Sequence, residues 1–444
     1  MKAGIFAAAV GMSVIMPSMA VAQTTIIHAG RLIDVPGEAP RGASTIIVKD
    51  GRIVSVVDGH AQIPDGADYI DLSDKTVLPG LIDSHVHLTS DAGGLAGQLE
   101  AVTLSPAAQA FNAQANGMKT LRAGFTTVRN LGDGDGAVFA LRDAVNAGKV
   151  IGPRIIDAGS SLSGTAGHSD DALGYRDELR PFFAGAGSTC DGAEDCRRAA
   201  RQQIGRGADV IKMTITGGVN SRIGAGLGSQ MFDDEAAAIV ATARMFGRKV
   251  AVHSHGADGT LQALRLGVDS IEHGTMLSEE VIALWAKSKT YYVPTLSTVN
   301  GYKERLAANP DAYEPDVLAK IKWRIDITGK TLQTLVPRGV RIAFGTDAGV
   351  SKHGRNGDEF ELMVAHGMTP ESALVAATIN AADLLGLSGE VGTIAPGKSA
   401  DIIAVAGDPL TDVSVYKDVQ FVMARGNVIE LKQSAGRYLA GTGG

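Results

Sequence analysis

Two histidines separated by one residue, His85 and His87, end an apolar run of the sequence. If that run is a β-strand, side chains two positions apart lie on the same face, so both imidazoles can bind one metal ion. The pair alone is weak evidence, because surface and core histidines produce the same spacing. Four more polar residues are placed in the same way, within or at the end of an apolar run: Lys212, His253, His273 and Asp347.

Each of these residues has an ordinary structural explanation when it is taken alone. A buried histidine can be satisfied by backbone groups, Lys212 can extend to the rim of the fold, and Asp347 can cap the next helix. A series of such coincidences at successive strand ends is improbable. Neutral imidazoles and carboxylates bind Zn²⁺ and similar divalent ions. The pattern therefore predicts a metal site, with zinc as the first candidate and manganese, cobalt or iron left open.

Lys212 does not fit a metal site as a cation, but its surroundings are nearly apolar and favour the neutral amine. A neutral amine can add CO₂ and become a carbamate, which is an anionic ligand able to bridge two ions. A site with two ions can hold a hydroxide between them and polarise a carbonyl at the same time. We therefore expect two divalent ions and carboxylation of Lys212.

The elements that position these residues are eight apolar runs, which alternate with helical stretches such as residues 196–205, 233–246 and 316–335. The alternation predicts an α/β fold with a (β/α)8 TIM barrel, and a doubly wound open sheet is the alternative. The polar candidates fall at C-terminal ends of runs, which is the catalytic face of a barrel. The runs are residues 77–87, 125–128, 153–158, 208–213, 249–253, 268–273, 291–296 and 341–347.

Both ends of the chain contain short β-rich segments with turns, including an Asp-Gly hairpin turn at residues 50–51. Neither end has enough strands for a stable sheet alone, so we expect one small β-sandwich built from both termini. The expected divisions are a signal peptide at 1–22, sandwich segments at 23–77 and 389–444, and the barrel at 78–388.

The N-terminus has the plan of a secretory signal peptide, with a positive start, an apolar stretch and Ala-Val-Ala before Gln23. A buried N-terminal helix is the alternative. Removal of residues 1–22 leaves 422 of the 444 residues, with no membrane span, in the periplasm or outside the cell. Cys190 and Cys196 then lie in an oxidising compartment. A disulfide between them stays open, because one uninterrupted helix would hold them too far apart.

The composition is that of a globular protein, with 45% hydrophobic and 20% charged residues. The net charge of −7 and the lack of a basic cluster argue against nucleic acid and anionic membranes as partners. The glycine-rich segments lack the lysine and the spacing of a phosphate-binding loop. We expect a small-molecule amide or peptide as the partner. Oligomeric state stays open, with a homo-oligomer allowed.

Several motifs resemble those of the amidohydrolase superfamily across essentially the whole mature chain. Thr-Ile-Thr-Gly-Gly at 214–218 and Gly-His at 167–168 are similar to the imidazolonepropionase-related branch, which includes Xaa-Arg/Lys and Xaa-Pro dipeptidases and ochratoxinase-like amidases. The superfamily motifs are Pro-Gly-Leu-Ile-Asp-Ser-His-Val-His at 79–87, Val-Ile-Lys at 210–212, Val-His-Ser-His at 252–255, Ile-Glu-His-Gly at 271–274, Gly-Thr-Asp-Ala at 345–348 and the sandwich stretch at 392–401.

The resemblance implies a role for each candidate ligand. His85 and His87 would bind the first metal ion, and carboxylated Lys212 would bridge the two ions. His253 and His273 would bind the second ion, with His255 in a supporting or loop position. Asp347 would contact the first ion, act as general base for a bridging hydroxide and pass the proton to the leaving amine.

The resemblance also implies a substrate pocket and an activity. We expect a metal-dependent amidohydrolase that cleaves a dipeptide or an N-acyl amino acid, including ochratoxin-like amides; a cyclic amide, lactone or carbamate is the alternative substrate. A relative that has lost catalysis is disfavoured, because every ligand and the base are present. Arg222 or Arg355 could hold a substrate carboxylate. His168 would donate a hydrogen bond to the substrate, and the expected pocket residues are His168, Gly217, Gly218, Val219, Asn220, Arg222 and His353.

Overall fold

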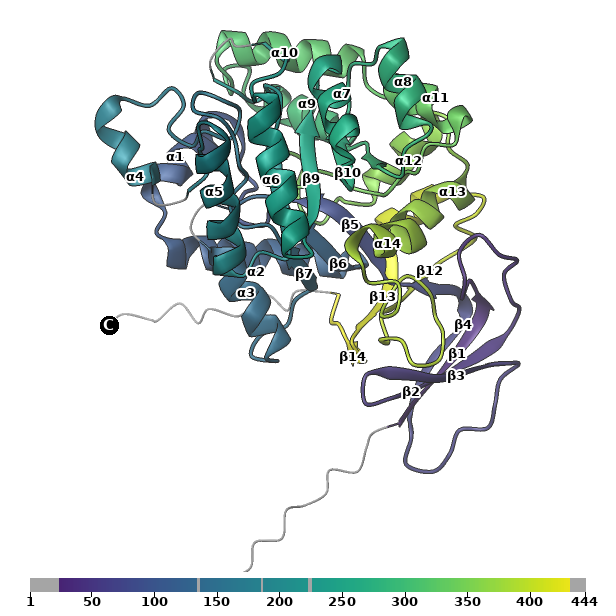
Figure 1. Cartoon of the computed structure of the whole chain (residues 1–444). Coiled ribbons are helices and arrows are strands. Elements are labelled where there is room, and N and C mark those ends of the chain that lie inside the picture. The colour runs from purple at the N-terminus through teal and green to yellow at the C-terminus, as the bar shows by residue number, and fades with distance from the viewer. Residues whose placement is uncertain (1–23, 134–135, 185–186, 223–225, 432–444) are drawn as a thin grey trace, which may run out of the picture.

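A computed structural model describes residues 24–133, 136–184, 187–222 and 226–431 of the chain (Figure 1). The predicted signal peptide, residues 1–22, lies outside the described residues. Within the described ranges, no helix combines the length and the apolar character that a membrane crossing needs.

Two parallel sheets hold the strands that carry the candidate ligands. Nearly every residue of these strands is buried, and strands buried on both faces form continuous apolar runs, which is why the sequence showed them. The first sheet has the order β5 (Leu81–Val86), β6 (Phe125–Asn130) and β7 (Arg154–Asp157). The second has the order β11 (Tyr291–Val293), β10 (Ser270–His273), β9 (Lys249–Ser254) and β8 (Val210–Thr214).

Backbone hydrogen bonds connect the two parallel sheets. Beyond β7, Leu162 N donates to Lys212 O at 2.9 Å, and Thr214 N donates to Leu162 O at 2.8 Å. The chain after β7 therefore lies against β8, the edge strand of the second sheet.

The eighth predicted strand, residues 341–347, makes isolated bridges instead of a regular ladder. Tyr292 N donates to Arg341 O, and Asp347 N donates to His85 O, each at 2.8 Å. This segment thus lies between β11 and β5. Asp347 has a φ of 57°, a left-handed conformation that is uncommon for non-glycine residues, so the chain turns away before a longer ladder forms.

Helices follow most of the parallel strands. They are α1 (Gly94–Thr103), α2 (Pro106–Arg122), α3 (Ala137–Asn146), α4 (Arg180–Ala184), α5 (Ala193–Arg206), α6 (Asp233–Met245), α7 (Ala257–Leu266), α8 (Glu279–Trp285), α9 (Thr298–Ala308), α10 (Pro315–Asp326), α11 (Lys330–Leu335), α12 (Asp358–Ala365), α13 (Pro370–Val375) and α14 (Ala381–Leu385). Figure 1 shows α5, α6 and α7 on the outside of the strands.

The prediction of one helix at residues 316–335 was wrong, because the structure has two helices there, α10 and α11. Gly329 lies between them with a φ of 78°, a conformation that favours glycine. A Cβ at this position would also lie 2.1 Å from the ring of His366. The break turns the two helices apart, and α10 becomes a separate element beside the site.

A seven-stranded sheet contains strands from both ends of the described chain. β4 pairs in parallel with β1 and in antiparallel with β12, with Pro79 opposite Ile402. Its strands, in sheet order, are β14 (Asn427–Val428), β13 (Val419–Ala424), β12 (Ile402–Val405), β4 (Asp68–Pro79), β1 (Thr24–Leu32), β2 (Ser44–Lys49) and β3 (Arg52–Asp58). In Figure 1 the part of this sheet with β1, β2 and β3 extends away from the helices, at the lower right.

The seven-stranded sheet is joined directly to the candidate ligands. β4 ends at Pro79 and β5 begins at Leu81, so only Gly80 separates the two strands. A Cβ at Gly80 would lie 2.2 Å from Thr126 Oγ1, so a larger residue would push apart β5 and β6. The packing at this junction helps to fix the strand that ends at the two histidines.

Cys190 and Cys196 form a disulfide, with their Cα atoms 4.9 Å apart. Cys190 lies in the loop before α5, and Cys196 lies in the first turn of that helix. Because the helix begins only at Ala193, the two cysteines are not separated by a rigid helical segment.

Candidate metal centre and substrate cavity

The six predicted metal ligands line one cavity of about 110 Å³. His85 belongs to β5 and His87 follows it directly, so both project from the same strand end. The others come from β8, β9, β10 and the segment that lies against β5, and they are Lys212, His253, His273 and Asp347.

His85, His87 and Asp347 form the first group of ligand atoms, and these atoms lie within 4.8 Å of one another. Asp347 Oδ1 is 3.5 Å from His85 Nε2 and 3.3 Å from His87 Nε2. Within the described part of the chain, this buried oxygen has no hydrogen-bond partner. An orphaned carboxylate oxygen facing two imidazoles fits a divalent ion as their common partner.

The protonation states of this group favour metal binding. Burial raises the pKa of Asp347, but the neighbouring His85, His87 and Lys212 outweigh it and hold the pKa well below its usual range. Burial, followed by the charge of Lys212, lowers the pKa of His85 to about 4. A carboxylate and a neutral imidazole are the forms that bind metal ions.

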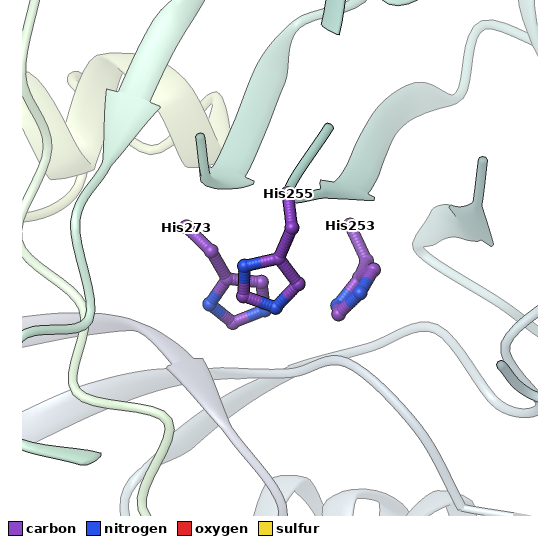
Figure 2. Close-up of side chains that lie close together, drawn as sticks. All are labelled: His253, His255 and His273. Atoms are coloured by element: carbon purple, nitrogen blue, oxygen red, sulfur yellow. The ribbon is translucent and has the colours of Figure 1, made fainter. Parts of the chain in front are cut away.

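His253, His255 and His273 form the second group, again with ligand atoms within 4.8 Å of one another (Figure 2). The ring centroids of His253 and His273 are 4.7 Å apart, and those of His253 and His255 are 4.8 Å apart. Burial first, then the neighbouring rings and cations, lowers the pKa of all three histidines. The structure therefore places His255 among the candidate ligands, whereas a supporting or loop position was expected for it.

Lys212 is buried, with 3% of its surface exposed. Burial lowers its pKa to about 8, against the opposing charges of Glu272 and Asp347. A lysine with this pKa spends more time as the neutral amine than an exposed lysine does. The position and the chemistry of Lys212 are thus compatible with a bridging carbamate.

Glu272 and Arg129 support the first group from behind. Glu272 Oε2 lies 2.9 Å from His85 Nδ1, and Arg129 Nη2 donates to Glu272 Oε1 at 2.9 Å. Burial raises the pKa of Glu272, but Arg129 and His85 outweigh it and lower the pKa to about 2. Such a carboxylate fixes the orientation of a ligating imidazole. Sequence analysis did not consider Arg129 and quoted Glu272 only as part of a motif, although each is a charged residue within a buried strand.

Asp83 fixes the segment that carries Asp347. Its Oδ2 accepts from Thr346 Oγ1 at 2.6 Å and from Asn356 Nδ2 at 2.8 Å. Its Oδ1 accepts from the backbone N of Thr346 at 3.1 Å. These bonds hold the residue next to Asp347 against β5. Asp83 was quoted as part of a motif, but no local pattern indicates these partners, which lie more than 260 positions away.

His168 lies at the junction of the inner cavity and a larger outer cavity. Its ring stacks on His253, with centroids 4.2 Å apart, and its Nδ1 is 2.7 Å from Ser221 Oγ. Burial, followed by the charge of Lys212, lowers its pKa to about 4. This neutral ring lines both cavities, and its hydrogen bond to a substrate stays a prediction.

Residues 219–222 line the two cavities, and Gly217 and Gly218, which were also predicted for the pocket, lie directly before them and line neither cavity. A Cβ at Gly218 would lie 2.2 Å from the His168 ring, so only glycine allows this approach. Gly217 O is 3.5 Å from His253 Nε2, and Asn220 Nδ2 donates to Tyr302 OH at 3.2 Å. Val219 and Asn220 line the inner cavity.

His353 lies away from the place that the sequence predicted. It lines neither of these two cavities. Its Nδ1 is 3.1 Å from Thr120 Oγ1, and its Nε2 is 3.1 Å from His87 O and 3.2 Å from Ser90 O. The histidine is buried, and both of its ring nitrogens contact other parts of the chain. These contacts help to hold the segment that follows His87 in position.

The outer cavity has a volume of about 490 Å³ and shares His87, His168, Asn220 and Val350 with the inner one. Its lining includes the apolar and aromatic residues Leu104, Leu173, Tyr175, Phe182, Phe183 and Val317. Together the cavities offer a polar inner end and a wider outer end, where these apolar side chains alternate with polar ones such as Glu100, Asp170 and Glu314.

The two arginines that the sequence offered for a substrate carboxylate both have acidic partners. Arg222 lines the outer cavity, where its Nη2 is 3.3 Å from Glu314 Oε1 and its guanidinium lies over the Tyr175 ring. Arg355 pairs with Glu304 and Asp358 and lines neither of these cavities.

Comparison with known proteins agrees with this geometry. Residues 76–429 match the amidohydrolase family, and the chain belongs to that family. It is 34% identical to the ochratoxinase of Aspergillus niger over 419 residues, covering 90% of this chain and 85% of the relative. It is 23% identical to the imidazolonepropionase of Deinococcus radiodurans, covering 88% of this chain and 90% of that one.

Solved structures give the same family. The fold is similar to that of a Xaa-Pro dipeptidase with methionine bound in its active site, with a TM-score of 0.86 and 38% identity, over 92% of this chain and all (100%) of that one. Relatives of this fold imply a TIM barrel with a β-sandwich domain. The protein is thus a hydrolase, and its family supports amide hydrolysis with metal-binding histidines.

Proposed function

We propose that the protein is a binuclear metal-dependent amidohydrolase that cleaves the amide bond between an acyl group and an amino acid. Its substrates are dipeptides or N-acyl amino acids, and ochratoxin-like amides belong to this class. The observation that carries the proposal is the convergence of two groups of ligand atoms on a cavity that also contains Lys212. The activities named for the ochratoxinase and the Xaa-Pro dipeptidase support the substrate class.

In the proposed centre, His85, His87 and Asp347 hold one ion, and His253 and His273 hold the other, with His255 beside them. Lys212, carboxylated by CO₂, bridges the two groups. When bound, the ions supply the Lewis acidity that polarises an amide carbonyl and makes water a better nucleophile. Zinc suits this donor set best, since imidazole and carboxylate are its usual nitrogen and oxygen ligands.

Asp347 is the proposed general base. It is ionised and lines the inner cavity, so its carboxylate can accept a proton from the attacking water. The same carboxyl then passes the proton to the nitrogen of the leaving amino acid. His168 has its Nδ1 against Ser221 Oγ, which leaves Nε2 to donate to the substrate.

We further propose that the two parallel sheets and residues 341–348 form one closed (β/α)8 barrel, and that the protein acts in the periplasm or outside the cell. The hydrogen bonds of Leu162 to β8 and of Asp347 to β5 support the barrel. The Cys190–Cys196 disulfide supports export, because disulfides persist mainly in oxidising compartments.

The test is a hydrolysis assay with purified protein lacking residues 1–22. A panel of dipeptides and N-acyl amino acids is incubated with the metal-loaded enzyme, and the released amino acid is measured. Elemental analysis of the same sample should give close to two divalent ions per chain. One ion or none at full activity would contradict the binuclear centre.

The same panel contains a cyclic amide, a lactone and a carbamate. Turnover of these compounds without release of an amino acid from any linear amide would contradict the proposed substrate class. A chelator-treated sample, reloaded with zinc, manganese, cobalt or iron in turn, identifies the metal from the recovered rate.

A further inference from the structure

Arg324 is a buried cation without a partner among the described residues. It lies on α10, has 3% of its surface exposed and lines the inner cavity together with the candidate metal ligands. Within the described ranges, its guanidinium makes no hydrogen bond and no ion pair. Arginine stays protonated in proteins, so this charge is present at any working pH. A buried charge is costly unless it is paired, which calls for an anion that the described residues do not provide.

Arg129 shows what the fold does with a structural arginine. It is also buried, with 1% exposed. Its guanidinium donates to Ser84 O at 2.6 Å, to Ser270 Oγ at 3.1 Å and to Glu272 at 2.9 Å. The fold thus provides partners for buried Arg129 but, among the described residues, none for Arg324 on α10.

The neighbours of Arg324 do not neutralise it. The groups that its charge affects include His255, Tyr292 and Tyr302, and none of them is anionic at neutral pH. Asp347, a carboxylate that lines the same cavity, contacts His85 and His87 instead of Arg324. Lys320, one turn earlier on the same face of α10, already donates to Gly218 O at 3.0 Å and to Ser221 O at 2.6 Å. Of these two cations on α10, only Arg324 is therefore left for a ligand.

We propose that Arg324 binds the carboxylate of the amino-acid half of the substrate. This inference rests on the proposed amide hydrolysis and deepens it by naming the specificity-determining residue. The planar guanidinium matches a carboxylate with two parallel hydrogen bonds. Tyr302 and Thr298 line the same cavity and add polar groups around that carboxylate.

The proposal also fixes the direction in which the substrate lies. The carboxylate end enters the inner cavity with Arg324, and the acyl group extends past His168 into the outer cavity, where the aromatic side chains lie. The enzyme is therefore specific for a free carboxylate on the residue that leaves. Arg355 lines neither of these cavities, and Arg222 lines only the outer one, where Glu314 Oε1 lies 3.3 Å from its Nη2.

The kinetic test uses Arg324→Met, Arg324→Lys and the control Arg355→Met, in which an arginine outside these cavities is removed. The substrates are the fastest N-acyl amino acid of the panel and its C-terminal carboxamide. We expect Arg324→Met to lower kcat/KM for the acid about 30-fold or more, because an anion loses a buried charged partner. The value for the carboxamide should change little, Arg324→Lys should be intermediate, and Arg355→Met should match the wild type.

A binding test keeps the inference separate from the proposed hydrolysis. Calorimetry compares L-phenylalanine with L-phenylalaninol, which lacks the carboxylate and has no amide to cleave. The wild type should prefer the acid, and Arg324→Met should lose that preference. If the wild type hydrolyses no amide, the proposed function fails, and this binding ratio alone decides the role of Arg324.

Thermal unfolding distinguishes a ligand-binding arginine from a structural one. Removal of an unpaired buried cation should leave the Tm of Arg324→Met equal to or above that of the wild type. Unchanged acid-to-carboxamide and acid-to-alcohol ratios in Arg324→Met would overturn the inference, as would a wild type without preference for the acid. If Arg324→Met does not fold, the ratios of Arg324→Lys and of the wild type make the same decision.

Discussion

The floor and the wall of the site differ in how their charged side chains are compensated. The floor consists of the six predicted ligands together with Glu272 and Arg129, and the wall consists of α10 and residues 217–222. On the floor, Arg129 pairs with Glu272, and Glu272 contacts His85. On the wall, Arg324 has no partner among the described residues, although it is almost as buried as Arg129.

This difference indicates which part of the site performs chemistry and which part selects the substrate. A fully paired network holds side chains in one geometry, which is what metal ligands and a general base require. An unpaired buried charge destabilises the free protein and gains a partner only when a ligand binds. It therefore favours substrates that carry the opposite charge. Changes on the floor should therefore reduce turnover of every substrate, whereas changes on the wall should depend on the substrate.

The largest effect should come from Asp347→Asn on the floor. The amide keeps the shape of the side chain but cannot accept a proton from water, and loss of a general base lowers kcat by ~10²–10⁴-fold. Steady-state kinetics measures the loss, while circular dichroism and elemental analysis should show an intact fold and most of the metal. Asp408→Asn, which removes a surface partner of Arg31, is the control. Retention of more than about a tenth of the wild-type kcat would show that Asp347 is not the base.

Lys212→Arg should lower metal content and activity together. Arginine keeps its charge and cannot form a carbamate, so the bridge between the two groups of ligands is lost. Elemental analysis and kinetics measure both quantities, and a short carboxylic acid added to Lys212→Ala should partly restore them. Full metal content with normal turnover in Lys212→Arg would leave Lys212 as a structural or substrate-binding cation.

Glu272→Gln should have a smaller effect on the floor. The amide still reaches His85 Nδ1 but loses the charge that orients the imidazole and raises its basicity, which lowers metal affinity by roughly 10–100-fold. Competition with a chelator measures the affinity. Glu280→Gln removes an exposed partner of Arg265 and is the control. Equal affinities in the two variants would mean that Glu272 supports only the fold.

The sequence predicted the floor better than the wall for a physical reason. Each candidate ligand lies at the end of its own buried strand, so a local pattern of apolar runs and polar ends is enough to identify it. His255 was underrated because β9 ends at Ser254, and strand alternation does not settle the direction of the next residue.

The features that were missed depend on residues far apart in the chain. Arg129 and Glu272 are 143 positions apart, and no pattern within one segment shows that they meet. Arg324 looked like any charged residue of a surface helix until the break at Gly329 and the packing of α10 placed it in the cavity. That it has no partner among the described residues depends on which distant segments pack around it, and no local pattern shows this. The N-terminal signal peptide, which lies outside the described residues, stays a prediction.

The smallest effect should come from Lys320→Met on the wall. Lys320 holds residues 217–222 through the carbonyls of Gly218 and Ser221, and Ser221 Oγ in turn contacts His168 Nδ1. Loss of these bonds loosens one side of the cavity without touching a metal ligand, so KM should rise roughly 3–10-fold at a nearly constant kcat. Lys322→Met, an exposed lysine on the same helix, is the matched control for helix content. A fall in kcat as large as that of Glu272→Gln would place Lys320 with the floor and remove the distinction between the two regions. Kinetics equal to those of Lys322→Met would show instead that residues 217–222 keep their position without Lys320, and that Arg324 alone makes the wall selective.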